Sequence, residues 1–417
     1  MNDCVENFLK KVFMKYVVLI GDGMADDPQD HHGGKTPLEA ARTPNLDRLS
    51  RGAVLGLVRT VPKGMHAGSD VANLAILGYD PSMHYTGRAP IEAAGLGVEL
   101  KPGETALRCN LVSLRREGKS LVMDDYSSGQ ISNEEAAALM ATIQEQLGRD
   151  GVRFYPIVSY RNLCVIRGFD DRLHATPPHD FLNGAVDEHW PACPGAILVR
   201  SLVEASQKIL AEHPVNQKRR QQGLKCADSI WLWGHGTMPK LKTIPERDGL
   251  SGVVISGVDL VRGLGKLAGL TIIRVPGATA DIHTNYEGKV AAALEALRKQ
   301  DFAYLHVEAP DESSHQGNLA EKIEAIELFD RRVVGPMFEG MQKLGQPFRM
   351  LIMPDHMTPV KERTHRDDPV PFMIVDSKQA AGKGETGPGL TERAAAATKL
   401  LIEKGYELLD THLLQKG

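Results

Sequence analysis

The sequence predicts an α/β protein in which both ends of the chain build one sheet and an α+β domain is inserted between them. Three apolar, strand-like runs, at 16–20, 303–307 and 350–353, each stop just before acidic residues. The stretch between these runs has a different sequence pattern, typical of a separate α+β module. A length of 417 residues also exceeds one ordinary core. We therefore expect two domains.

The first strand is predicted at 16–20 and runs into Gly21-Asp22-Gly23. Thr43 and Pro44 then read as an N-cap and the first helical residue of an amphipathic helix. In open α/β sheets, ligands bind outside the carboxyl ends of the strands. The three strand ends followed by acids are therefore expected to meet at one site.

The middle of the chain is predicted to contain strands at 106–114 and 154–166. Ser132 and Glu135 form a capping-box pattern that opens a helix running to about Leu147. We expect the sheet domain to comprise 14–88 and 273–417, and the inserted domain 89–272. Residues 1–13 lack an apolar signal core and are predicted to be a dispensable extension before Met14.

Composition and charge exclude several classes of function. The net charge of −4 gives no basic field for nucleic acid or an anionic membrane surface, so neither is an expected partner. Apolar runs are far shorter than the roughly 20 residues that a membrane span needs. Five cysteines without a CxxC pair indicate a reducing compartment, and we expect a cytoplasmic protein. The oligomeric state stays open.

A short helix is predicted to begin at Ser69, in GSDVAN (68–73), and to close at Gly78. Ser69 has two interpretations. It can cap the helix, or its hydroxyl can act as a nucleophile, because a helix N-terminus favours an anionic oxygen and a phosphoryl group. Asp22 is likewise either a turn residue or a metal ligand. The GDG turn lacks the GxGxxG spacing of a dinucleotide site.

Candidate metal ligands gather in the last third of the chain: Asp311, His315, Asp355, His356 and His365. Mixed carboxylate and imidazole sets suit zinc, manganese and related divalent ions, whereas calcium prefers oxygen alone. A single histidine is more often a surface or hydrogen-bonded residue than a ligand. Acids at three strand ends, histidines close behind and a serine at a helix start together indicate metal-assisted chemistry.

Six segments share one resemblance: GDGM (21–24), TPNLD (43–47), GSDVAN (68–73), EAPDE (308–312) with His315, PDH (354–356), and TH (364–365) followed by PVP (369–371). Together they resemble archaeal-type cofactor-independent phosphoglycerate mutase, over nearly all of the chain from Met14 onward. The resemblance implies an alkaline-phosphatase-like sheet domain and a glycolytic mutase reaction through a phosphoserine on Ser69. It also implies two divalent ions, with manganese favoured over zinc, cobalt or magnesium.

Carried over by motif, the resemblance gives each ion its own ligands. One would be held by Asp311, His315 and His365, and the other by Asp22, Ser69, Asp355 and His356. The inserted domain would be a substrate-binding cap that closes over the sheet domain. Phosphoglycerate is strongly anionic, so Arg161, Arg219 and Lys289 are the predicted substrate-binding cations, against the alternative of solvated surface charges. Weaker candidates for acid–base chemistry are Asp124 and His235.

Two alternatives remain open at this stage. Sequences that resemble this family have also been proposed as homoserine kinases, and a metal-activated serine could serve either reaction. A kinase needs a nucleotide, yet the sequence has no GxxxxGK[ST] loop, which favours the mutase. The second alternative is a catalytically silent, metal-binding regulatory protein. All seven matched metal-site positions carry competent residues, which argues against that interpretation.

Overall fold

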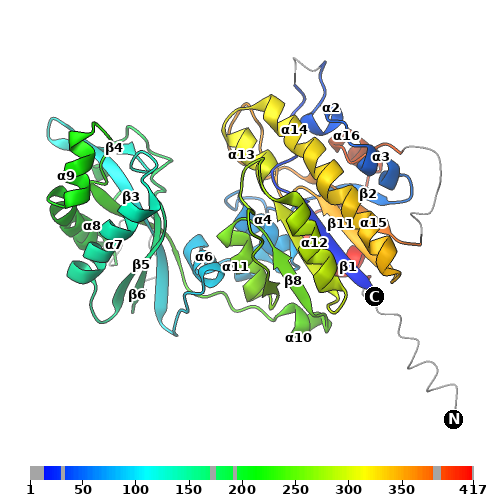
Figure 1. Ribbon diagram of the computed structural model, residues 1–417, viewed down its shortest axis with the longest axis horizontal. Helices are drawn as coiled ribbons and strands as arrows, with labels where there is room; N and C mark the ends of the chain where they lie inside the picture. Colours follow the sequence, from blue (N-terminus) through cyan, green and yellow to red (C-terminus); the bar gives the residue numbers. More distant parts are fainter. Residues whose placement is uncertain (1–13, 30–32, 170–174, 191–194, 379–386, 416–417) are drawn as a thin grey trace, which may run out of the picture. The chain divides into compact units, whose positions relative to one another are not determined.

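The computed structural model describes residues 14–29, 33–169, 175–190, 195–378 and 387–415. The expected extension at 1–13 lies outside the described residues. The chain forms two compact units (Figure 1). Unit 1 contains the chain up to Tyr85 and from Lys240 onward, and unit 2 is Thr86–Pro239. Within the described residues, no helix has the length and apolar character to cross a bilayer.

Unit 1 is built on one mixed sheet with the strand order β13-β2-β12-β11-β1-β10-β8-β9. The four strands from β11 to β8 run parallel, whereas β12 pairs antiparallel with both β11 and β2. The strands are β1 (Lys15–Gly21), β2 (Val54–Val58), β8 (Gly252–Ile255), β9 (Thr271–Ile272), β10 (Phe302–Val307), β11 (Phe348–Met353), β12 (Val370–Asp376) and β13 (Leu401–Ile402). Both chain ends contribute neighbouring strands, as the sequence predicted.

Helices cover the sheet of unit 1. One face packs against α3, α12, α14 and α15, and alternate strand residues such as Val17 and Leu19 fill the core beneath them. The helical segments are α2 (Pro37–Ala40), α3 (Pro44–Ser50), α4 (Ser69–Ile76), α5 (Pro81–His84), α10 (Ile244–Asp248), α11 (Asp259–Leu267), α12 (Tyr286–Leu297), α13 (Ala309–His315), α14 (Leu319–Phe329), η3 (Asp330–Val334), α15 (Gly335–Leu344), α16 (Glu392–Ala397), η4 (Gly405–Glu407) and η5 (Leu409–Leu413).

Unit 2 is an α+β module with a five-stranded antiparallel sheet. Its strands are β3 (Glu104–Glu117), β4 (Ser120–Asp125), β5 (Val152–Val158), β6 (Arg161–Arg167) and β7 (Ser229–Gly236). Its helical segments are α6 (Arg88–Leu96), α7 (Asn133–Leu147), η2 (Val186–Glu188), α8 (Ala196–Ala211) and α9 (Pro214–Gln221). Ser132 caps α7 by accepting a hydrogen bond from Glu135 N, and α7 ends at the predicted Leu147.

The second boundary between the units differs from the sequence analysis, which assigned everything up to 272 to the insertion. β8 pairs in parallel with β10, Val254 opposite Tyr304, so the segment from Lys240 onward belongs to the sheet of unit 1. Helix α11 packs on this strand, since a Cβ at Gly265 would lie 2.4 Å from Val254 Cγ1. A four-residue apolar strand suits either kind of sheet, and the pattern alone could not assign it.

Candidate metal centre

Three neighbouring parallel strands of unit 1 end at one level. Gly21 at the end of β1 is in register with Val307 of β10, and Ile20 with Met353 of β11. The segments that follow contribute Asp22, Asp311 and Asp355, all buried, with Asp311 in the first turn of α13. The carboxyl ends of the strands thus bring together acids from opposite ends of the chain.

The first ligand group is Asp311, His315 and His365. On α13, Asp311 and His315 are four residues apart and face the same side, with Asp311 Oδ2 3.1 Å from His315 Nε2. His365 Nε2 lies 3.5 Å from Asp311 Oδ1 and 2.9 Å from His315 Nε2. His315 Nδ1 donates to the carbonyl of Arg363 at 2.9 Å, which leaves Nε2 as the atom that could bind an ion.

The second group is Asp22, Asp355, His356 and Ser69. His356 Nε2 is 3.4 Å from Asp22 Oδ1, 3.5 Å from Asp355 Oδ2 and 3.1 Å from Ser69 Oγ. The two groups are adjacent, because ligand atoms of Asp22, Asp311 and His356 all lie within 4.8 Å of one another. All seven sequence-predicted metal-site residues therefore lie at one edge of the sheet.

Ser69 is not the N-cap of its helix. The N-cap of α4 is Gly68, and Ser69 is the first helical residue. Its hydroxyl instead lies against His356 Nε2, at the edge of the second ligand group. The capping interpretation is therefore wrong, and the nucleophile interpretation stays a prediction.

Asn73, one turn further along α4, connects the serine to the ligands. Its amide donates to the Ser69 carbonyl at 2.8 Å and to Asp355 Oδ2 at 2.7 Å, and its oxygen accepts a hydrogen bond from Tyr304. Asn73 is fully buried. The GSDVAN motif includes this residue, but sequence reasoning gave it no role.

The electrostatics of the second group suit a cation. Burial raises the pKa of Asp22 well above its ordinary value, and the nearby Asp355 and Asp311 raise it further. Neither oxygen of this carboxylate receives a hydrogen bond from the part of the chain that the structure describes. Burial also lowers the pKa of His356 to about 4, so its ring stays neutral and can ligate. Oxygen and neutral imidazole donors fit a divalent transition ion.

His306 and Glu308 are further candidates that sequence reasoning missed. His306 Nε2 is 3.1 Å from Asp22 Oδ2, and a Glu308 oxygen completes a third compact group with these two. His306 lies in an otherwise apolar strand, so the sequence pattern gave no sign of it.

Lys289, a predicted substrate-binding residue, lies on α12, is fully buried, and donates to the His306 carbonyl at 3.2 Å. Burial lowers the pKa of Lys289 to about 8.

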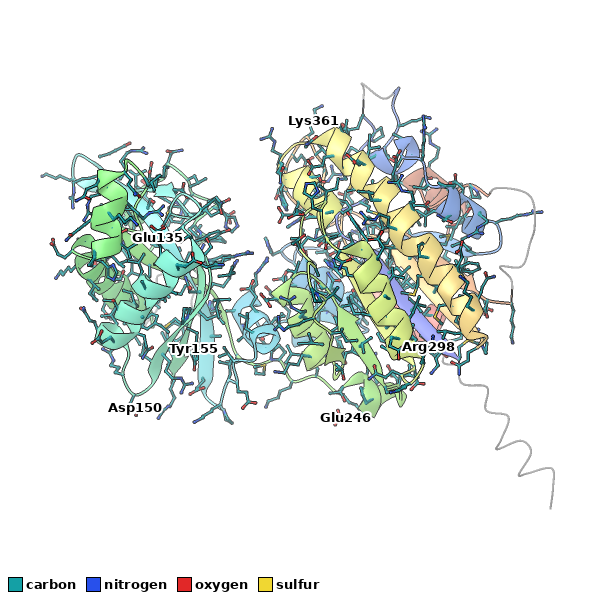
Figure 2. The ribbon with its side chains drawn as sticks, viewed as in Figure 1. Glu135, Asp150, Tyr155, Glu246, Arg298 and Lys361 are labelled. Carbon is teal, nitrogen blue, oxygen red and sulfur yellow. The ribbon has the colours of Figure 1, made fainter. Side chains whose placement is uncertain are left out.

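The two predicted arginines of unit 2 have different environments. Arg219 is buried and fully engaged: it donates to the carbonyls of Lys225 and Ser128, and to Glu135 on α7 (labelled in Figure 2). These contacts account for Arg219 as a structural residue. Arg161 begins β6, is exposed, and lies over the Tyr160 ring at 5.7 Å.

Arg161 belongs to a cluster of cations that the sequence did not reveal. Arg88 and Arg108 pair with the two oxygens of Glu92, at 2.9 and 3.1 Å. Burial raises the pKa of Glu92, but the charges of Arg108, Arg88 and Arg161 outweigh it and leave the pKa lowered. Two arginines pair with this carboxylate and the charge of a third acts on it, which leaves an excess of positive charge. Asp124, in contrast, pairs with Arg115 and Lys225.

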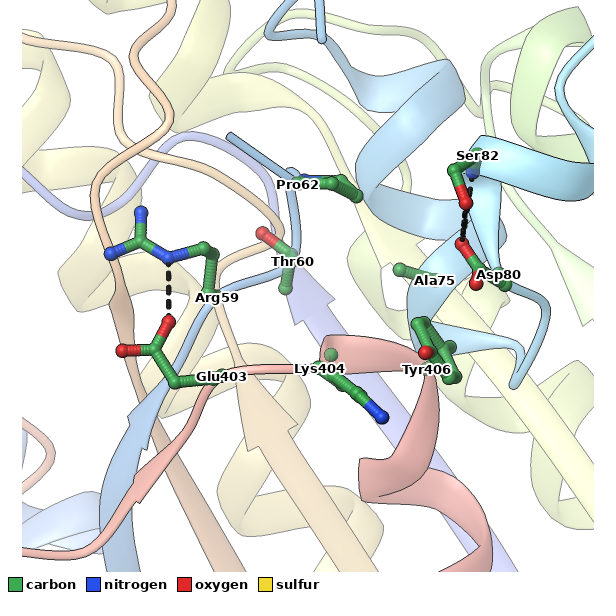
Figure 3. Close-up of a pocket in the computed structure, with 10 residues that line it drawn as sticks. Arg59, Thr60, Pro62, Ala75, Asp80, Ser82, Glu403, Lys404 and Tyr406 are labelled. Carbon is green, nitrogen blue, oxygen red and sulfur yellow. Dashed lines mark hydrogen bonds and ion pairs between the residues drawn. The ribbon is translucent and has the colours of Figure 1, made fainter. Parts of the chain in front are cut away.

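A pocket of about 190 Å³ lies beside α4, away from the ligand groups (Figure 3). Its lining includes Arg59, which pairs with Glu403 at 3.0 Å, and Thr60. Thr60 donates to the carbonyl of Asp355, so the pocket wall supports the loop after β11. None of the predicted ligands lines this pocket.

The mixed sheet of unit 1, with candidate ligand groups at its carboxyl edge, defines an α/β protein with a candidate metal centre. The family model described as 2,3-bisphosphoglycerate-independent phosphoglycerate mutase matches residues 50–216. An enzyme of that name from Methanothrix thermoacetophila is 51% identical over 364 residues, 87% of this chain and 91% of the relative. The chain belongs to the family of 2,3-bisphosphoglycerate-independent phosphoglycerate mutases.

Two solved structures are similar to this chain over nearly their whole length. A Pyrococcus horikoshii protein aligns over 95% of this chain and 96% of its own, with 27% identity and a TM-score of 0.78. A cofactor-independent phosphoglycerate mutase from Thermoplasma acidophilum aligns over 96% of this chain and 99% of its own, with 25% identity and a TM-score of 0.62.

We predict that protonated His315 stabilises the metal-free protein, and that this contribution to the free energy of unfolding falls as the pH rises from 6.5 to about 9. Burial lowers the pKa of His315, but the hydrogen bond and charge of Asp311 outweigh it and raise the pKa from 6.5 to about 9. Folding therefore favours the protonated ring, and this contribution is complete below pH 6.5 and lost as the pH passes 9. Urea unfolding of the wild-type protein and of His315→Gln, both in the presence of a chelator and across this pH range, measures the contribution. Parallel pH profiles for the two proteins would contradict the prediction.

Proposed function

We propose that this chain interconverts 3-phosphoglycerate and 2-phosphoglycerate through a phosphoserine on Ser69, without bisphosphoglycerate. The supporting observation is that Ser69 Oγ lies against His356 at the point where two metal-ligand groups adjoin. Membership of the mutase family supplies the substrate. The proposed compartment is the cytoplasm, in keeping with the free thiols of Cys109, Cys164 and Cys226.

The proposed cofactors are two divalent ions, with manganese favoured. The first would be held by Asp311, His315 and His365, and the second by Asp22, Ser69, Asp355 and His356. When bound, such ions lower the pKa of a coordinated hydroxyl and neutralise charge on a transferring phosphoryl group. The buried Asp22 carboxylate, which receives no hydrogen bond from the described residues, supports this assignment.

Ser69 has the chemistry for the transfer. It opens an eight-residue helix, whose N-terminal end favours an anionic oxygen and a phosphate. Ser69 Oγ loses its proton and forms a bond to phosphorus while the bond from phosphorus to the substrate oxygen breaks, and that oxygen takes up a proton. The other hydroxyl of the bound glycerate then loses its proton and attacks the phosphorus. The bond from phosphorus to Ser69 Oγ breaks, Ser69 regains a proton, and the isomeric product is released.

Unit 2 is the proposed substrate-binding domain. Its cluster of Arg88, Arg108 and Arg161 suits a small carboxylate or phosphate, because guanidinium groups bind both through paired hydrogen bonds. Arg161 is the exposed member of this cluster and is the proposed contact. Lys289 stays a proposed phosphate-binding residue on the strength of the motif, while Arg219 is better explained by its structural contacts.

The reaction is tested with purified protein and 3-phosphoglycerate, with neither bisphosphoglycerate nor ATP added. We expect 2-phosphoglycerate to form. Treatment with a chelator should abolish the activity, because the chelator competes with the ligand groups for the ions, and added Mn²⁺ should restore it. Product formed only with ATP would instead support a kinase. Full activity in a verified metal-free sample would contradict the role of the ions.

Replacing the nucleophile should remove turnover and leave the fold intact. Ser69→Ala loses one hydrogen bond, which costs about 0.5–1.5 kcal/mol of stability. Mass spectrometry of wild-type protein mixed with substrate should find phosphate on Ser69, and the alanine variant should carry none. Ser82→Ala, in the following helix, is the matched control and should keep full activity. Phosphate on another residue, or near-normal turnover of Ser69→Ala, would overturn the mechanism.

The proposed substrate contact in unit 2 predicts a change in KM. Arg161→Met should raise the KM for 3-phosphoglycerate about tenfold or more, since a hydrogen bond to a charged group contributes about 1.5–3 kcal/mol. Steady-state kinetics measures the effect. Arg116→Met removes an exposed arginine from β3 of the same unit and should leave KM unchanged. Equal kinetic constants for the two variants would refute the contact.

A further inference from the structure

Thr358 lies between the two ligand groups and touches both. Its hydroxyl donates to Asp311 Oδ1 at 2.7 Å and is 3.1 Å from His356 Nδ1. Asp311 belongs to the first group and His356 to the second. The side chain of Thr358 is fully buried.

The chemistry of the hydroxyl fixes the direction of both hydrogen bonds. A threonine hydroxyl has a single proton, and here that proton goes to the Asp311 carboxylate. The hydroxyl oxygen can then only accept from His356, so Nδ1 of that ring must carry the proton. In a neutral imidazole the lone pair is then on Nε2, which faces Asp22, Asp355 and Ser69.

Hydrogen bonds of the Thr358 backbone fix the position of its hydroxyl. Thr358 N donates to the Ala25 carbonyl at 3.1 Å, and the Thr358 carbonyl accepts from Lys322 Nζ at 2.8 Å. Lys322 is itself fixed by the buried carboxylate of Asp26, at 2.9 Å.

Gly23 closes the remaining side. It has a positive φ of 63°, and a Cβ there would lie 2.7 Å from both Asp311 Oδ1 and Thr358 Oγ1. Only a glycine therefore permits the loop after β1 to pack over the hydrogen bond between these two side chains. Thr358 and Asp311 are both buried beneath this loop.

We propose that Thr358 is a positioning residue that links the two metal sites: it orients Asp311 in one and selects the metal-binding tautomer of His356 in the other. The inference rests on the proposed two-metal function. Groups that orient metal ligands typically change metal affinity about 10- to 100-fold when they are removed. Because one hydroxyl serves both groups, its loss should weaken both sites rather than one.

The test compares Mn²⁺ binding by equilibrium dialysis for the wild-type protein, Thr358→Val and Thr358→Ser. Valine keeps the shape and removes both hydrogen bonds, so the Kd of each of the two sites should rise about 10- to 100-fold. Serine keeps the hydroxyl and should restore binding at both. Thr105→Val makes the same change at another buried threonine, in unit 2, and should bind like the wild type.

The tautomer provides a second readout that needs no change at Thr358. In metal-free protein with ¹⁵N-labelled histidine, the signal that disappears in His356→Gln should show a protonated Nδ1. A protonated Nε2 alone at this ring overturns the inference even if Thr358→Val does not fold. Unchanged affinities in Thr358→Val, or weakening at a single site, also overturn it. Wild-type protein that binds no Mn²⁺ would refute the two-metal proposal itself, and the inference with it.

Discussion

The parallel register of β1 with β10 and β11 is the constraint on which the rest of the structure depends. It ends three strands at one level and buries the carboxylates that follow them side by side. Buried like charges repel one another and lose their hydration, and the raised pKa of Asp22 records both costs. A divalent cation offsets both. The backbone pairing of an ordinary α/β sheet thereby produces a buried group of carboxylates that a divalent cation would stabilise.

A second layer of buried polar residues holds these ligands where the strands deliver them. Asn73 joins the start of α4 to Asp355, and Thr358 joins Asp311 to His356. Beneath them, Lys322 ties the loop after β1 to the loop after β11 through two carbonyls. A buried lysine adds little net stability even when it is paired, but removing its partner is costly. Its contribution here is placement, since metal ligands must be oriented before the ion arrives.

Features set by neighbouring residues in the chain could be predicted from the sequence, whereas contacts between distant segments could not. Strands that stop at Gly-Asp or Pro-Asp, and ligands in the loops behind them, are visible in the order of residues alone. His306 was missed because an apolar strand surrounds it, and the place of β8 because four apolar residues suit either sheet. Arg219 was chosen for its charge, although three protein acceptors already occupy its guanidinium. Such pairings depend on distances across the fold, which spacing along the chain does not encode.

The unequal charge of the two ligand groups bears on when Ser69 can react. The first group combines one carboxylate with two imidazoles, whereas the second places Asp22 and Asp355 around His356, the ring that Ser69 touches. An alkoxide formed there without a cation would face two carboxylates in a poorly hydrated setting, where like charges repel strongly. His356 gives no positive charge of its own, because burial lowers its pKa to about 4. In the proposed mechanism, the same acids that would hold the ion disfavour an alkoxide on Ser69 in its absence, so the serine would react only when the ligand set is filled.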